Sequence, residues 1–266
     1  MSQYDFGIIM PCYNYASELP KSLEKIRQWR AKNKLNFVFC IVDDGSSDST
    51  LATAQTFQKE HADWCQVHSL AQNQGKGKAI RAGAALVCDL APFIMFTDCD
   101  LHYGLSIVHE RILPALKEGS DIVILDRSWN KQFHSNSAIR RFLSRGFNHL
   151  KTILTGVPYE DSQAGLKGFR SEFLRGTLLI SQINGFAFDV ELLSIAIHFR
   201  LRVERIPILL NSKLSASQTS VTLRKAVTMF FDLLRIALNR YSGAYSSDFL
   251  DKLVEKRVYE INEESF

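Results

Sequence analysis

The sequence predicts an α/β fold with a mostly parallel central sheet and helices on both faces. Short, nearly continuous apolar runs alternate along the chain with segments of helical periodicity, which is typical of this architecture. Of the 266 residues, 46% are hydrophobic and 23% are charged, as in an ordinary globular protein. Four polar motifs, PCYN, DDGS, NQGKGK and TDCD, follow predicted strands on the side where such sheets bind ligands.

Five apolar runs are expected to form strands. They cover residues 5–11, 35–42, 64–70, 91–100 and 120–127. After the first strand, apolar residues recur at helical spacing through 19–33, and Pro20 suits the first turn of a helix. A second helix is expected over 49–61, with Ser47 or Asp48 as its cap. A third helix follows the NQGKGK loop.

The pattern changes after about residue 215, so we expect one domain over 1–215 and a helical extension over 216–266. Residues 221–240 combine apolar positions at helical spacing with basic side chains. The basic residues in and beside this helix are Lys213, Arg224, Lys225, Arg235 and Arg240. Two interpretations remain open: a helix packed against the sheet domain, or a helix lying on an anionic membrane surface.

Charge and cysteine content narrow the classes of function. The net charge of +4 is a mild excess that suits an anionic ligand or a membrane surface. No basic run is dense enough to indicate nucleic acid as a partner. The five cysteines are scattered and never spaced as C-x-x-C, which favours a reducing compartment such as the cytoplasm. We see no signal peptide and no apolar run of about 18 residues, so no membrane span is expected.

The TDCD motif places two carboxylates at the end of a predicted strand. Residues two apart in an extended chain point the same way, so Asp98 and Asp100 can converge on one point. Such a pair repels unless a cation lies between the carboxylates, and Mg2+ or Mn2+ bridges carboxylates to substrate phosphates. The motif therefore indicates a metal–diphosphate site, while a helix-capping turn remains the alternative.

Two further loops are suited to a nucleotide. Asp43 or Asp44 in DDGS could accept hydrogen bonds from a base or a ribose, although a simple acidic turn is the alternative. The NQGKGKA loop carries Lys76, whose ammonium group suits an anionic ligand. A P-loop and a dinucleotide fingerprint both fail, because Ala79 and Ile80 stand where a hydroxyl and a glycine are required.

Eight motifs resemble, in order, those of family 2 glycosyltransferases of the GT-A fold. They are PCYN, VDDGSSDST, NQGKGKAIRAG, FTDCDL, DIVILDRS, RRFLSRGFN, DSQAGLKGFR and GFAFDVELL. The sequence is most similar to the polyprenyl- or dolichyl-phosphate sugar synthases, of the glucosyltransferase or mannose synthase type. The resemblance spans about residues 6–215 and implies a GT-A catalytic domain there.

The resemblance implies a role for each matching residue. The positions that would bind the nucleotide are Pro11, Tyr13, Asp43, Asp44, Lys76 and Asp98. The positions that would meet the acceptor phosphate are Arg127, Arg140, Arg141, Ser144 and Lys167. Asp161 and Gln163 would line the sugar pocket. The residues that would carry the chemistry are Asp98 and Asp100, as metal ligands, with Asp161 and Arg127.

The chain departs from the family pattern at two positions. Tyr15 stands where the family often has an acid after the Tyr-Asn pair. His102 stands two residues after the second aspartate of the metal pair, where a glutamine is frequent. His102 could ligate a borderline ion such as Mn2+, or be a loop histidine satisfied by its neighbours.

The resemblance implies a metal-dependent, inverting transfer of a hexose from a UDP- or GDP-linked sugar to a polyprenyl or dolichyl phosphate. A phosphate acceptor is largely an anion at neutral pH and needs no base, whereas a hydroxyl acceptor would need one, for which Asp161 is the candidate. Two alternatives stay open: an acceptor that is a soluble glycan, protein or small hydroxyl compound, and a non-catalytic module that binds sugar nucleotides. The helix over 221–240 would allow peripheral contact at the cytoplasmic face of a membrane. The DRSW and SKLSASQTS runs favour glucose slightly, and the sequence is silent on oligomeric state.

Overall fold

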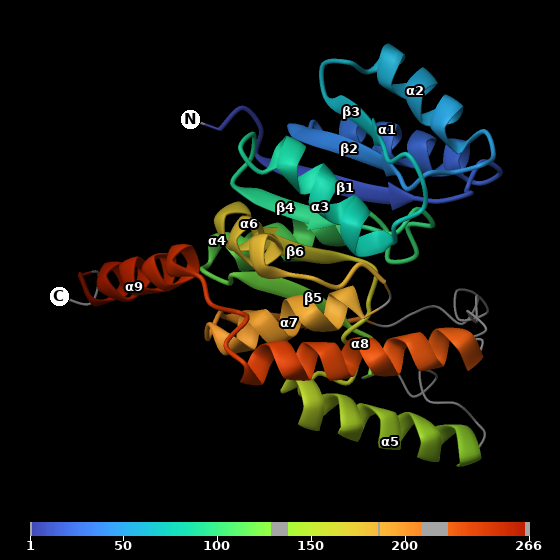
Figure 1. The fold of residues 1–266 in the computed structure, drawn as a ribbon. Helices are drawn as coiled ribbons and strands as arrows, with labels where there is room; N and C mark the ends of the chain where they lie inside the picture. The colour runs from blue at the N-terminus through green and yellow to red at the C-terminus, as the bar shows by residue number, and fades with distance from the viewer. Residues whose placement is uncertain (1, 129–137, 186, 209–222, 264–266) are drawn as a thin grey trace.

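The computed structural model describes residues 2–128, 138–185, 187–208 and 223–263, and a seven-stranded sheet forms its centre (Figure 1). The strands are β1 (Phe6–Cys12), β2 (Phe37–Asp43), β3 (Cys65–Ser69), β4 (Phe93–Phe96), β5 (Ile122–Asp126), β6 (Lys167–Arg170) and β7 (Val203–Pro207). Their order across the sheet is β3-β2-β1-β4-β6-β5-β7. Every neighbouring pair is parallel except the two pairs that involve β6. The expectation of a mostly parallel sheet is confirmed.

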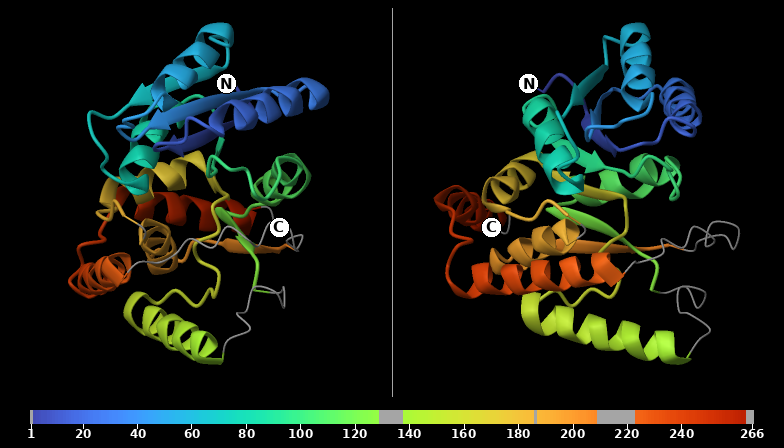
Figure 2. Two further views of the ribbon diagram at one scale, coloured as in Figure 1. Left: turned by 90° about the vertical axis from the view of Figure 1, so that its right-hand side faces the viewer. Right: turned by 45° about the vertical axis from the view of Figure 1, so that its right-hand side comes forward.

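Helices cover both faces of the sheet, as the apolar character of its strands requires (Figure 2). They are α1 (Leu19–Asn33), α2 (Thr50–Glu60), α3 (Lys76–Val87), α4 (Leu113–Lys117), α5 (Ala138–Thr155), α6 (Ser171–Ile180), α7 (Phe188–His198), α8 (Leu223–Tyr241) and α9 (Asp248–Glu263), with a π-helical turn η1 (Val108–Ile112) before α4. Helices α3, α6 and α7 lie on one side of the sheet, and α1 and α4 lie on the other (Figure 2). The α/β architecture predicted from the sequence is therefore present.

Aromatic side chains pack together around the first residues of β1 and β2. All seven residues of β2 are buried, because β2 lies inside the sheet and is covered on both faces. The rings of Phe6 and Phe37 stack with centroids 5.1 Å apart, and Trp64 meets Phe37 edge-on at 5.5 Å. This aromatic packing fixes the two strands whose carboxyl ends carry the PCYN and DDGS motifs.

The register brings the chemically distinctive loops to one edge of the sheet. Cys12 at the end of β1 pairs with Asp43 at the end of β2, so the loops that follow are neighbours. Phe96 at the end of β4 pairs with Lys167, the first residue of the antiparallel strand β6. The loops after β1, β2 and β4 and the first residue of β6 therefore meet at the carboxyl edge of the parallel strands.

The C-terminal helices pack against the sheet domain through several buried residues. Helix α8 contacts α5 and α7, and its Leu233 and Ile236 are fully buried. Tyr245, between α8 and α9, is also fully buried, and its hydroxyl donates to Glu191 at 2.9 Å. Within the described ranges, no helix is both long enough and apolar enough to span a bilayer. The expected boundary near residue 215 falls outside the described residues and stays a prediction.

Candidate active site

Three loops at the carboxyl edge contact one another directly. Asn14, after β1, accepts from the Ser47 N–H at 2.8 Å, and its own N–H donates to the Ser46 hydroxyl at 2.9 Å. The Asp44 carboxylate accepts from the backbone N–H groups of Gln74 and Gly75, both at 2.8 Å. The PCYN, DDGS and NQGKGK motifs thus form one continuous surface, as their position after parallel strands predicted.

The two aspartates of DDGS have protein donors in this structure. Asp44 is buried and clamps the lysine loop through both carboxylate oxygens. Asp43 is buried and accepts from the Ser69 hydroxyl at 2.9 Å and from the Ser46 N–H at 3.3 Å. Gly45 has a φ of +69°, and a Cβ there would lie 2.3 Å from the Gln72 carbonyl carbon, so the turn requires glycine. The predicted role of Asp43 and Asp44 in nucleotide binding stays a prediction.

Pro11 and Tyr13 lie beside this turn, at the end of β1. The Pro11 carbonyl accepts from the Cys99 thiol at 3.1 Å, and the Cys99 and Cys12 sulfurs are 2.8 Å apart. The ring of Tyr13 is 49% exposed, which leaves it accessible to a planar ligand. The TDCD loop is thereby attached to the PCYN loop through its central cysteine.

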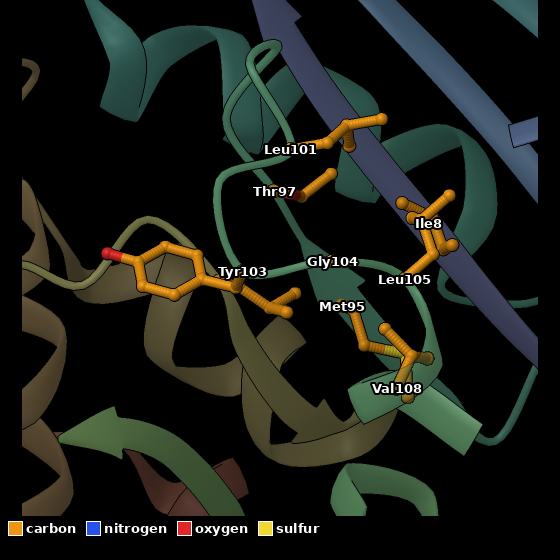
Figure 3. A pocket seen from close by; sticks show the side chains of 9 residues that line it. Ile8, Met95, Thr97, Leu101, Tyr103, Gly104, Leu105 and Val108 are labelled. Carbon is orange, nitrogen blue, oxygen red and sulfur yellow. The ribbon is translucent and has the colours of Figure 1, made fainter. Parts of the chain in front are cut away.

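The loop that carries Asp98 and Asp100 is anchored by apolar side chains over a small cavity (Figure 3). The cavity has a volume of about 10 Å³, and its lining includes Leu101, Leu105 and Val108. Asp98 is supported from behind by Gly165, where a Cβ would lie 1.8 Å from the carboxylate Oδ2. The loop that carries Asp98 and Asp100 is therefore supported by the residues packed against it.

The carboxylates of Asp98 and Asp100 are partly exposed, at 44% and 39%, and each has a basic neighbour. Asp98 Oδ1 lies 3.0 Å from the Lys76 Nζ, and Asp100 Oδ2 lies 3.0 Å from the His102 Nδ1. Among the described residues, no three His, Cys, Asp or Glu side chains are grouped as a preformed metal centre. Two exposed carboxylates nevertheless suit a hard cation that takes its other ligands from a diphosphate and water.

Lys76 belongs to a chain of alternating charges that runs into the interior. Its Nζ also lies 3.4 Å from Asp189 Oδ2, and Asp189 Oδ1 lies 2.8 Å from the Lys167 Nζ. Burial opposes the charge of Asp189, but the ammonium groups of Lys167 and Lys76 outweigh it and hold its pKa below the usual value. Burial also opposes the charge of Lys76, but Asp189 and Asp98 raise its pKa above the ordinary value.

Lys167 lies in the interior of the protein. Its side chain is fully buried, and its ammonium donates to the Ala164 carbonyl at 2.6 Å as well as to Asp189. Burial lowers the pKa of Lys167, and Asp189 opposes this effect. Lys167 positions Asp189, and its predicted contact with an acceptor phosphate stays a prediction.

Arg127 and Asp161 form a closed pair at the end of β5. The guanidinium donates to both Asp161 oxygens, at 2.7 Å from Nε and 2.6 Å from Nη2, and the Arg127 backbone N–H adds a bond of 2.8 Å. The Asp161 side chain is 2% exposed and that of Arg127 is 25% exposed. Burial disfavours the charge of Arg127, but Asp161 outweighs it and raises the pKa of Arg127 above its ordinary value. Asp161 is thus engaged on both oxygens.

The remaining predicted residues lie near this pair along the chain. Gln163 is exposed on the loop after Asp161. Arg140, Arg141 and Ser144 fall in the first half of α5, and their side chains lie outside the described part of the structure. Their predicted contact with an acceptor phosphate stays a prediction.

Sequence reasoning missed several residues that shape the site. Asp189 was present in the quoted GFAFDVELL motif, where an acid inside an apolar run was the available signal. Lys151 is 1% exposed and bonds the Tyr159 carbonyl, which steadies the loop that carries Asp161. Tyr103 accepts from the Gly165 N–H at 3.3 Å, and its ring lies 6.0 Å from the Arg127 guanidinium carbon.

The fold is shared with solved glycosyltransferases of the GT-A type. The chain aligns with glucosyl-3-phosphoglycerate synthase from Mycobacterium tuberculosis, solved with Mn2+, UDP and glucosyl-3-phosphoglycerate, at a TM-score of 0.63 and 17% identity, covering 89% of this chain and 80% of that one. Mannosyl-3-phosphoglycerate synthase from Rubrobacter xylanophilus aligns at a TM-score of 0.60 and 16% identity, covering 92% and 77%. At these identities the likeness shows the fold, which is the GT-A fold that the sequence predicted.

Sequence comparison identifies the family. The model described as Glycosyl transferase family 2 matches residues 7–177. Dolichyl-phosphate beta-glucosyltransferase from Mus musculus is 30% identical over 90% of this chain and 76% of its own length, and the one from Homo sapiens is 29% identical over the same shares. The relative from Drosophila melanogaster with the same name is 27% identical over 77% of this chain and 66% of its length. The chain belongs to glycosyl transferase family 2 and is a glycosyltransferase, which sets aside the non-catalytic alternative.

Proposed function

We propose that the protein is a metal-dependent, inverting transferase that moves a hexose from a nucleoside diphosphate sugar to a polyprenyl or dolichyl phosphate. The names of the mouse and human relatives support glucose as the sugar and dolichyl phosphate as the acceptor. Within the site, the Arg127–Asp161 pair is the observation that favours a phosphate acceptor over a hydroxyl acceptor.

The hydrogen bonds between Asp161 and Arg127 favour a phosphate acceptor over a hydroxyl acceptor. A hydroxyl nucleophile needs a general base, and Asp161 is the candidate that the sequence supplied. Both of its oxygens accept charge-assisted bonds from Arg127, so Asp161 is already committed to holding that side chain. A phosphate monoester needs no such base, because its second pKa is near ~6 and it is largely dianionic at neutral pH. The Arg127 side chain is 25% exposed, so its guanidinium group can orient a phosphate oxygen toward the sugar.

The donor end of the site is assigned to the acidic loop and the lysine loop. Asp98 and Asp100 would hold Mg2+ or Mn2+, which neutralises the charge that develops on the departing diphosphate. Lys76 lies within 3.0 Å of Asp98 and is placed to meet a phosphate oxygen. Tyr13 offers an exposed ring for the base, beside the turn held by Asp43 and Asp44. These residues bind and orient the donor while the acceptor provides the nucleophile.

A membrane contact through α8 and α5 would bring the site to a lipid phosphate. The two helices lie side by side, with their first residues toward the active-site edge (Figures 1 and 2). Phe231 and Leu238 on α8 are 62% and 70% exposed, and Ile153 on α5 is 57% exposed. Apolar side chains at helical spacing on an exposed face, beside basic residues, suit the interface of an anionic bilayer. All five cysteines are buried free thiols, in keeping with a cytoplasmic face.

Flotation with vesicles tests this contact. At low salt, we expect binding to vesicles that contain phosphatidylserine and weaker binding to neutral ones. Phe231→Ser should reduce the bound fraction several-fold, since it removes an exposed aromatic ring from α8. Leu179→Ser is the matched control, because Leu179 is 71% exposed on α6. Equal loss in both variants, or no binding by the unmodified protein, would contradict peripheral docking through α8.

Transfer to a lipid tests the function itself. The protein is incubated with Mn2+ and labelled UDP-glucose, GDP-mannose or UDP-N-acetylglucosamine, together with a short polyprenyl phosphate. We expect label in the organic phase, most strongly with UDP-glucose. No label is expected there when the polyprenyl phosphate is replaced by the corresponding polyprenol, which lacks the phosphate group. Label on a water-soluble hydroxyl compound, with none on the lipid phosphate, would favour the soluble-acceptor alternative.

A further inference from the structure

A lysine occupies the place beside Asp98 where a metal cation would be expected. The Lys76 Nζ lies 3.0 Å from Asp98 Oδ1 and 3.4 Å from Asp189 Oδ2, so this ammonium group is shared between two carboxylates. Asp189 is in turn 2.8 Å from the Lys167 Nζ. The four formal charges alternate and sum to zero.

The backbone around Lys76 fixes it between these partners. Lys76 is the first residue of α3, and the neighbouring Gly77 N–H donates to the Asn184 carbonyl at 2.9 Å. Gly75 has a φ of +97°, and a Cβ there would lie 2.4 Å from the same carbonyl oxygen. The lysine loop is therefore pressed against the segment that leads into α7, where Asp189 lies near the start. Asp98 approaches from β4, so Lys76 bridges two parts of the site.

We propose that Lys76 is an internal counter-ion that competes with the divalent cation for Asp98, and that Asp189 positions Lys76 when donor and cation arrive together. The proposal rests on the proposed function, since it takes Asp98 as a metal ligand. Asp189 keeps an ion pair with Lys76 after Asp98 has turned to the cation, so the ammonium group stays in the site and meets a diphosphate oxygen. Asp189 touches neither donor nor acceptor and is a positioning residue.

Charge balance predicts how the two ligands bind. A divalent cation alone would add positive charge beside Lys76, and the dianionic diphosphate of a nucleotide sugar alone would add negative charge beside Asp98. The two together add about zero net charge, so each removes the electrostatic penalty of the other. We therefore expect Mn2+ to bind the free enzyme weakly and to bind tightly together with a nucleotide sugar, with reciprocal coupling.

The test is a titration with Mn2+ that needs neither acceptor nor lipid, with free Mn2+ followed by electron paramagnetic resonance. Lys76→Met should bind Mn2+ alone on the order of tenfold more tightly than the unmodified protein, because a competing cation has been removed. The increase in Mn2+ affinity that UDP-glucose or GDP-mannose produces should shrink in the same variant. Lys78→Met is the matched control, since Lys78 is exposed on the same helix turn, and its Mn2+ affinity should stay within about twofold.

A second variant has the opposite expected sign. Asp189→Asn leaves Lys76 with Asp98 as its sole carboxylate partner among the described residues, so Mn2+ affinity should fall below that of the unmodified protein. Circular dichroism and thermal unfolding report whether Asp189→Asn still folds. If it does not, the comparison of Lys76→Met with Lys78→Met decides whether Lys76 competes with Mn2+ for Asp98. Unchanged or weaker Mn2+ binding in Lys76→Met overturns the proposal, as does an equal gain in Lys78→Met. These results leave the lipid-transfer test of the function unaffected, whereas a protein that transfers sugar without any divalent cation contradicts the metal role itself.

Discussion

Replacing Asp161 by asparagine distinguishes two roles for Asp161: a residue that positions Arg127, or a general base. The change keeps the shape of the side chain but removes the charge that receives two guanidinium bonds of 2.6 and 2.7 Å and one backbone bond of 2.8 Å. Removing one partner of a fully buried ion pair destabilises a protein by about 3–5 kcal/mol. Arg127 is 25% exposed, so water offsets part of this loss, and we expect a decrease of about 2–3 kcal/mol in the free energy of unfolding.

The kinetic consequence is expected mainly in acceptor binding. An Arg127 that has lost its partner is misoriented, and we expect kcat/KM for polyprenyl phosphate to fall by about 10- to 30-fold, chiefly through a higher KM. The acidic limb of the pH–rate profile should persist near pH ~6, because it belongs to the acceptor phosphate. Glu160→Gln is the control, since it removes the charge of the exposed neighbour. A loss of about a thousand-fold in kcat, with unchanged acceptor KM and no acidic limb, would show that Asp161 is a base and refute this reasoning.

Two further predictions concern the packing around the site. Gly165→Ala places a methyl group 1.8 Å from Asp98 Oδ2, so Asp98 must move. We expect Mn2+-dependent donor binding, measured by calorimetry, to weaken at least tenfold while the fold persists. Unchanged donor affinity would contradict the support that Gly165 gives to Asp98. Burial lowers the pKa of Lys151 to about 8 from 10.5, so the unfolded chain binds this proton more tightly and stability should rise between about pH 8 and pH 10. In Lys151→Met this rise should be smaller by as much as about 3 kcal/mol, and urea unfolding at both pH values should show the difference; identical pH dependence in the two proteins would refute it.

The strands and helices with long apolar patterns could be predicted from the sequence. All five expected strands are present. Four of them are apolar runs inside the sheet, whereas β3 is an edge strand that is only partly buried. Strands β6 and β7 were not predicted. Strand β6 has four residues and includes Gly168, and β7 has two charged residues among its five. The expected helix cap was partly wrong: α2 begins at Thr50, and Asp48 accepts from the Thr50 N–H at 2.9 Å, while Ser49 holds the cap position.

The candidate site was predictable where its residues follow strand ends, and less so where it depends on long-range contacts. Asp98 and Lys76 could be brought together from topology alone, because both follow strands with a common edge. The burial of Lys167 could not, since lysine is rarely interior and its partner Asp189 is 22 residues away along the chain. The pairing of Arg127 with Asp161 spans 34 residues and likewise leaves no local signal.

Donor binding with and without a cation, measured by calorimetry, tests the central role of the acidic loop most directly. The unmodified protein should bind UDP-glucose or another nucleotide sugar with Mn2+ and lose at least tenfold in affinity when EDTA replaces it. Asp100→Asn should show the weaker affinity under both conditions, because Asp100 supplies one of the two exposed carboxylates. Equal donor affinity with Mn2+ and with EDTA, or full donor affinity in Asp100→Asn, would contradict a donor held by Asp98 and Asp100 through a bridging cation.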